Sequence, residues 1–425
     1  MKESWISLQQ PVAEGALESV NFFNGRLLTA ADMRREQKGR RLADARLGEA
    51  LGHGVAFGLD VTLHPPDDDD KAVSLDISPG LAISPLGACL RLAFPERVHL
   101  TRQDSTTFVA GGCAFDDCAP LLGGTYVAGE GLYLLTIAPA EVGLGRAPSN
   151  GLGATSPKCD VDRLVEAVQF RLLEMRSDLY ATLDPADSGF RNEIAYRCFG
   201  AGVEQDWVTS LLAGGARGDD LVERMEQHGL SRSEVPLALV AFEGSATIRF
   251  LDSWAVRRPV APADPEGPFH SLIAPRRLAA GRAMFEQFQA QFADLLAGGK
   301  PGTDFQARTH FPHLPPVGIL PRTSEAQAAL FFDGMTVRGP VHINSPTLEP
   351  LVRESLSCPA IRSAGDEVVW LYAVAENLIE GARAAAAKDR PDPYLVFAAG
   401  NLPYRADARF NLHRWNYANY ALGGS

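Results

Sequence analysis

Two histidines separated by two residues, His310 and His313, have the type and spacing that come nearest to a metal site or a hydrolytic centre. A His-x-x-His pair on a helix can place both rings on one side and bind a metal there. Here, however, the segment 311–321 contains four prolines, which favour an extended chain. We therefore expect two loop histidines, and a hydrolase centred on this pair is the least favoured function.

Other patterns with chemical meaning are incomplete. Cys113 and Cys118 are the one close pair among six cysteines, and two thiols cannot supply the four ligands of a structural zinc site. The four aspartates of 67–70 lack the alternating ligands and the glycine of a calcium loop. The sequence has no Gly-x-Ser-x-Gly elbow, no phosphate-binding loop and no Gly-x-Gly-x-x-Gly that opens a helix. From these patterns we expect a protein that is not an enzyme and that has no catalytic residue, bound metal or cofactor.

The charge balance bears on the class of partner. The 425 residues include 40 basic and 52 acidic side chains, for a net charge of -12, and such a chain repels the phosphates of nucleic acids. Positive charge is concentrated in one stretch, which we interpret as a solvated or intersubunit helix face: Arg34, Arg35, Lys38, Arg40, Arg41 and Arg46. We find no secretory signal in the first ten residues and no apolar run of membrane-spanning length. We expect a cytoplasmic protein that binds no nucleic acid and does not insert into a membrane.

The basic stretch belongs to a helix predicted over 29–51. Thr29 and Asp32 have the spacing of a capping box, and Asn24-Gly25 just before them is a turn signal between apolar pairs. The apolar stripe of this helix is thin. A helix with so few core residues needs a partner, from its own chain or from another.

Period-two alternation and closely spaced turns predict β-structure after this helix, and the fold class is α+β, with β-sandwich or barrel-like domains. Two hairpins are expected, one around Pro85-Leu86-Gly87 and one that joins apolar runs at Gly244-Ser245. The apolar stripe of residues 277–297 predicts a helix. Asp160 is expected to cap a helix that reaches Leu183, with Leu164, Val168 and Leu172 on one face. The predicted parts are an N-terminal motif and helix (1–52), a β domain (53–110), a second β domain (111–258) with a helical insertion (160–230), and a C-terminal mixed α/β region with an aromatic tail (259–425).

Three N-terminal segments are similar to a known group of proteins. The segments 21–37, 53–61 and 78–87 resemble baseplate or cage-type structural proteins of phage-tail-like contractile injection systems, and more distantly the N-terminal shell of TssK, a type VI secretion baseplate subunit. The chain departs from the commonest pattern at Lys38-Gly39, where an aromatic is usual. The resemblance implies a structural protein that carries no catalytic residues.

Together these observations predict a non-enzymatic subunit that forms homo-oligomers and contacts other baseplate, sheath or spike proteins. The interface candidates are Phe22, Phe23, Asn24, Gly25, Arg26, Arg34, Arg35, Arg41, Trp415, Tyr417 and Tyr420. The alternative is a receptor- or carbohydrate-binding module of the same apparatus, in which exposed aromatics of the β domains stack on sugars.

Overall fold

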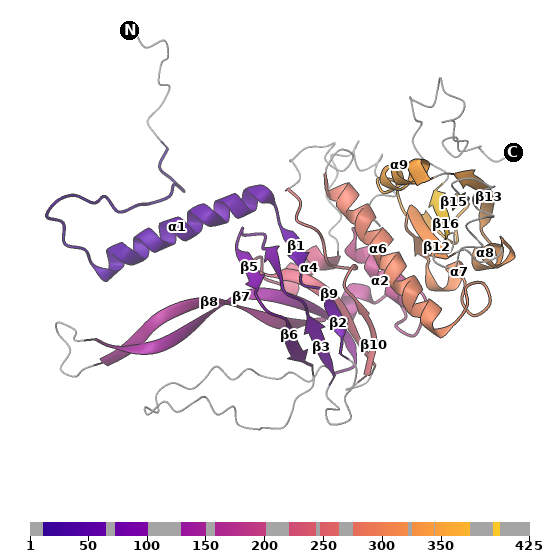
Figure 1. Ribbon diagram of the computed structural model, residues 1–425. Coiled ribbons are helices and arrows are strands. Elements are labelled where there is room, and N and C mark those ends of the chain that lie inside the picture. The colour runs from indigo at the N-terminus through magenta and orange to yellow at the C-terminus, as the bar shows by residue number, and fades with distance from the viewer. Residues whose placement is uncertain are drawn as a thin grey trace, which may run out of the picture.

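The computed structural model describes residues 12–64, 73–100, 129–149, 158–200, 221–243, 247–262, 275–321, 325–343, 345–374 and 394–399. Helices and several β-sheets alternate along the chain, so the predicted α+β class is confirmed (Figure 1). The described strands form open sheets of two to four strands, and none of these sheets closes into a barrel.

Helix α1 (Ala30–Leu51) follows the sequence prediction closely. Thr29 is its N-cap: the Thr29 hydroxyl accepts from the Asp32 amide, and the Asp32 carboxylate accepts from the Thr29 amide, which completes the capping box. Gly48 is the one buried residue of this helix. Figure 1 shows α1 projecting away from the sheets, joined to them at its C-terminal end.

Six short strands follow and form two antiparallel three-stranded sheets, in the orders β1-β4-β5 and β2-β3-β6. The strands are β1 (Gly54–Gly58), β2 (Val61–Leu63), β3 (Ser74–Ile77), β4 (Gly80–Ile83), β5 (Cys89–Leu92) and β6 (Glu96–His99). The pairing of β4 with β5 confirms the hairpin predicted around Pro85-Leu86-Gly87.

A four-stranded sheet of order β10-β9-β7-β8 lies at the centre of the molecule. Its strands are β7 (Gly131–Ser149), β8 (Lys158–Met175), β9 (Val235–Glu243) and β10 (Thr247–Asp252). Both faces of the inner part of this sheet are covered. Tyr133 and Leu135 face a core shared with the small sheets, whereas Leu132 and Leu134 between them face a second core with the helices. The antiparallel pairing of β9 with β10 confirms the predicted hairpin.

The prediction of a helix that begins at Asp160 is wrong. Residues Lys158–Met175 form strand β8, which pairs with β7 along its whole length. The physical reason is that the inner half of β8 lies between two cores. Val168 and Leu172 pack toward one core and Leu173 and Met175 toward the other, so apolar residues occupy both faces. This removes the alternation typical of a strand and leaves a spacing that imitates a helix.

In the rest of the predicted insertion, the described residues form short helices joined by turns. Its elements are η1 (Ser177–Tyr180), α2 (Phe190–Cys198), α4 (Leu221–Met225) and η3 (Glu226–His228). The residues 53–110 and 111–258 were predicted as separate domains, and this division stays a prediction. In the structure Leu75 and Ile77 share one core with Val240 and Phe242.

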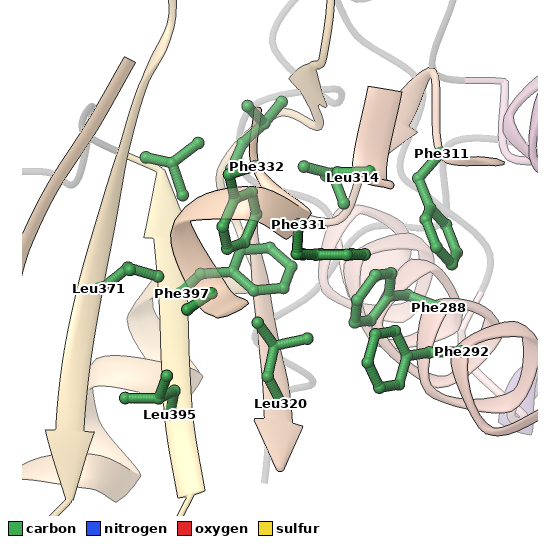
Figure 2. Packing of buried hydrophobic residues seen from close by; sticks show 14 of the residues in the cluster. Phe288, Phe292, Phe311, Leu314, Leu320, Phe331, Phe332, Leu371, Leu395 and Phe397 are labelled. Carbon is green, nitrogen blue, oxygen red and sulfur yellow. The ribbon is translucent and has the colours of Figure 1, made fainter. Parts of the chain in front are cut away.

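The C-terminal region is a four-stranded sheet of order β12-β16-β15-β13 with helices around it, in which β13 and β15 are parallel. Its elements are α6 (Pro275–Gly298), α7 (Ala307–His310), β11 (His313–Leu314), β12 (Val317–Pro321), α8 (Glu325–Phe331), β13 (Thr336–Ile343), α9 (Ser345–Ser355), β14 (Ile361–Arg362), β15 (Val368–Val374) and β16 (Tyr394–Ala399). Figure 2 shows Phe288 and Phe292 of α6 packing toward Phe331 and Phe397. The predicted helix over 277–297 is confirmed by α6.

A polar cluster, buried except for Asp294, joins this region to the central sheet. Arg191 of α2 donates to Asp252 at the end of β10 (2.7 Å) and to Asp294 of α6 (2.6 Å). Gln287 of α6 also donates to Asp252, at 3.0 Å. Because these charges are paired and hydrogen-bonded, the joint fixes which parts of the two regions meet.

Candidate interaction site: the N-terminal arm and the long hairpin

The N-terminal segment folds back along α1, and we call residues 12–51 the arm. The Val20 amide donates to the Glu36 carboxylate at 3.0 Å, and Arg46 donates to the Gly15 carbonyl. Gly39 lies where these two parts touch, since a Cβ atom there would come within 2.5 Å of the Glu18 carbonyl oxygen. This close approach explains why a glycine, and no aromatic residue, stands at that position of the motif.

One arginine braces the turn between the extended segment and α1. Arg26 donates to the Asn21 carbonyl and to the Asp32 carboxylate, each at 2.7 Å, and its guanidinium lies 5.9 Å from the centre of the Phe23 ring. Asp32 therefore accepts hydrogen bonds from both sides of the turn. The Thr29 hydroxyl is the main reason that the pKa of Asp32 is lowered to about 2, and Arg26 lowers it further.

The braced turn presents its apolar side chains to solvent, and we call residues 21–28 the apolar loop. Leu27 is 90% exposed, Phe23 62%, and Phe22 and Leu28 are also exposed. Four large apolar side chains gathered on a short, hydrogen-bonded loop form a patch that typically marks an interaction surface. Because the brace already orders the loop, little conformational freedom would be lost on binding.

The arm is fixed to the molecule at the C-terminal end of α1. Gly48 and Gly87 meet so closely that a Cβ on either would collide with the backbone of the other segment, and Gly52 meets Ala261 in the same way. Further out, Arg41 donates to Glu141 of β7 at 2.8 Å, between exposed side chains. The apolar loop is at the far end of α1, away from these anchors (Figure 1).

A second projection is the outer half of the β7–β8 hairpin. Strand β9 pairs only with residues 131–137 of β7, so among the described strands the ladder beyond residue 137 is a two-stranded ribbon. A two-stranded ribbon is at best marginally stable in water by itself. This ribbon nevertheless exposes five apolar side chains: Val142, Leu144, Val161, Leu164 and Val165.

The ribbon also places two acids side by side. Glu141 and Glu166 are directly opposite each other in the β7–β8 register, a like-charge arrangement that is unfavourable without a cation. Arg41 supplies one cation to Glu141. Leu164, which pairs with Gly143, lies on the same face of the ribbon, two residues from Glu166.

The structure brings together some of the predicted interface residues and separates others. Phe22, Phe23, Asn24, Gly25 and Arg26 all belong to the braced turn. Arg35 lies 3.8 Å from Glu18, and Arg34 makes no ion pair with the residues that the structure describes. The tail residues Trp415, Tyr417 and Tyr420 lie outside the described residues.

Sequence reasoning missed Leu27, Leu28 and the ribbon residues Leu164 and Glu166. Leu27 and Leu28 come shortly after the predicted Asn24-Gly25 turn, and this position could have indicated that they belong to an exposed loop. Leu164 and Glu166 were missed because the incorrect prediction of a helix over 160–183 gave them a different set of neighbours.

The two histidines do not turn toward a shared site. His310 contacts the Thr309 hydroxyl at 3.1 Å, whereas His313 stacks on Tyr196 at 3.6 Å between ring centres and lies 3.4 Å from Glu193. The hydrogen bond to His313 lowers the pKa of Glu193. Within the described ranges, no three His, Cys, Asp or Glu side chains gather as a metal site would require.

Among the described helices, none is both long enough and apolar enough to cross a membrane. Comparison with protein families finds no match, and comparison with curated proteins finds none. Comparison with solved structures finds a crystal structure of TssK, with 10% identity and a TM-score of 0.25. The match covers 68% of this chain and 51% of that one, so this chain spans about half the length of the structure it matches.

Proposed function

We propose that this chain is a non-enzymatic structural subunit, of the baseplate or cage type, in a contractile phage-tail-like injection particle. In this proposal it works in the cytoplasm as part of the assembled particle. Its partners are further copies of itself and other baseplate, sheath or spike proteins.

The arm is the observation that supports the proposal most strongly. It holds a rigid apolar loop at the far end of a helix that buries only Gly48, and the nearby ribbon exposes apolar residues as well. When a neighbouring molecule covers exposed apolar surfaces of this kind, the free energy of the assembly is lowered. The motif that resembles injection-system proteins, Asn21–Gln37, is the same segment that forms this loop and the first half of α1.

The proposal is tested by deletion of the gene in a strain that makes such particles, followed by complementation. The wild-type gene is expected to restore particles, and a Leu27→Ser variant is expected to restore far fewer because it removes an exposed apolar side chain of the loop. Leu296→Ser, which changes an exposed leucine of α6, is the matched control and should restore particles fully. Normal particles in the deletion strain would contradict the proposal.

A second candidate function is binding of a carbohydrate receptor. Two exposed aromatic side chains on the small sheets favour it, Phe57 of β1 and Phe94 between β5 and β6. Exposed aromatic rings can stack on sugars. Binding to a glycan array that is lost in Phe94→Ala but retained in Leu27→Ser would support this function over the first, and no binding by the wild-type chain would remove it.

A further inference from the structure

We propose that the arm is a strap that closes on the ribbon of its own copy through two neighbouring ion pairs. The structure holds the first of them, between Arg41 of α1 and Glu141 of β7 at 2.8 Å. The second, between Lys38 of α1 and Glu166 of β8, forms when the strap closes fully. The closed strap fixes the direction in which the arm projects, and salt releases it. This is a property of the single chain, so it does not depend on the proposed function.

The side of α1 that carries Arg41 also carries Lys38. Starting from Gly48, which touches Gly87 in the β4–β5 turn, steps of three or four residues lead along one side of the helix through Ala45 to Arg41 and Lys38. Arg41 reaches the ribbon from this side. Lys38 lies about one turn further from the anchored end, on the same side of the helix. The helical spacing therefore places its ammonium group toward the ribbon.

Lys38 has no acidic neighbour on its own helix. The residues three and four positions away from it are three cations and a leucine: Arg34, Arg35, Arg41 and Leu42. Like charges at these spacings destabilise a helix. Lys38 is exposed and makes no ion pair with the residues that the structure describes. An anion outside the helix is therefore needed to compensate its charge.

The ribbon holds two anions at a spacing that matches the two cations. Glu141 and Glu166 are directly opposite each other in the β7–β8 register, where Cβ atoms are about 5 Å apart. Cβ atoms three residues apart on a helix have a similar separation, about 5 to 6 Å. Within the described ranges, Glu166 has no ion-pair partner. Lys38 beside Glu166 would relieve the repulsion between the two carboxylates and the repulsion between the two cations together.

The anchored end of α1 allows the strap to close on this face of the ribbon. The two glutamates lie on the face of the central sheet that the small sheets cover further in, and α1 is anchored on those small sheets. Figure 1 shows α1 and the ribbon projecting to the same side of the molecule. A small rotation of the helix about Gly48 and Gly52 changes the distance from Lys38 to the ribbon, while the anchor stays in place.

Two exposed ion pairs make a contact that closes and opens readily. A single exposed pair contributes little and is screened by salt, whereas two adjacent pairs act on the same rotation of α1. The strap is therefore closed at low ionic strength and released at high ionic strength. Because the apolar loop lies at the far end of α1, release of the strap changes the position of this loop relative to the ribbon.

A zero-length carbodiimide crosslinker tests the second pair, because it joins a lysine amine to a carboxylate only when the two are in contact. In the full-length chain at low salt, we expect a crosslink between Lys38 and Glu166. A mixture of isotopically light and heavy chains should show by mass spectrometry that it forms within one chain. In 0.5 M NaCl its yield should fall at least about threefold, since the Debye length is then only about 4 Å.

The matched control moves the amine to the other side of the helix. Lys38 is the one lysine of α1, and Arg40 is two residues, or about 200°, away from it. The variant Lys38→Arg/Arg40→Lys should therefore give no crosslink to Glu166. The inference would be overturned by crosslinks of Lys38 that do not include Glu166, by crosslinks to Glu166 only between chains, or by a yield that salt does not change.

The direction of the arm is measured separately, by electron spin resonance distances between labels at Ala31 and Arg163, which are both exposed. At low salt the wild type should give one narrow distance distribution, and Lys38→Glu should broaden it. The exchanged pair Lys38→Glu/Glu166→Lys should restore the narrow distribution, which shows that the variants still fold. Arg40→Glu should match the wild type. Equal distributions in Lys38→Glu and the wild type would overturn the inference.

Discussion

At the scale of single residues, the order of the arm depends on a few hydrogen bonds to one carboxylate. Asp32 accepts from the amide and the hydroxyl of Thr29 and from Arg26, all close to the turn that holds the apolar loop. The sequence predicted the Thr29–Asp32 capping box from spacing alone. It did not predict the contact of Arg26, because that contact depends on the path of the chain through the Asn24-Gly25 turn.

The first prediction concerns the charge on Asp32. Since its pKa is lowered from 3.8 to about 2, the carboxylate stabilises the folded arm above pH 3.8, and this contribution is lost as the pH falls toward 2. Thr29→Val removes the hydroxyl and should raise the pKa of Asp32 toward 3.8. Thr29→Ser keeps the hydroxyl and should leave it low. The measurement is a carboxyl-carbon NMR titration, and an equal Asp32 pKa in both variants would contradict the assignment.

At the scale of elements, the sequence predicted those whose surroundings stay the same along most of their length. The helices α1 and α6 and the hairpins β4–β5 and β9–β10 agree with their patterns. Strand β8 does not, because its inner half faces two cores and its outer half faces solvent. Such a strand has no single periodicity, and only its pairing with β7 identifies it.

The second prediction concerns the anchor of α1. Alanine in place of glycine ordinarily stabilises a helix by about 1 kcal/mol. Gly48→Ala should instead destabilise the docking of α1 by about 1 to 3 kcal/mol, because its Cβ would collide with the Gly87 carbonyl. Faster hydrogen exchange near the C-terminal end of α1 would show this. Gly298→Ala, where no atom lies within 4 Å of the new Cβ, is the control and should not destabilise the chain.

At the scale of the whole molecule, the central sheet carries two kinds of attachment. The arm and the ribbon project from it with exposed apolar groups, while the C-terminal region is joined through the buried pair of Arg191 and Asp252 and through the exposed Asp294. The thin apolar stripe of the polar helix led us to predict segments that project from the molecule and bind a partner. Sequence reasoning could not find the joint, since nothing in the local pattern links residues 61 or 103 positions apart.

The third prediction concerns this joint. Arg191→Ala leaves Asp252 buried without its cation and should lower the free energy of unfolding by about 3 to 5 kcal/mol. Arg176→Ala removes an arginine from an exposed pair with Asp178 and should change it by less than about 0.5 kcal/mol. Chemical denaturation of both variants makes the comparison. An equal loss would show that the buried pair contributes no more than a surface pair.

The central claim is that this chain is a structural subunit whose projecting arm and ribbon are covered by neighbouring molecules. Electron cryomicroscopy of purified particles, with this chain located in the map, tests it most directly. We predict that the apolar loop 21–28 and the exposed leucines and valines of the ribbon are covered by other subunits. A map in which both surfaces face solvent, or particles from which the chain is absent, would contradict the account.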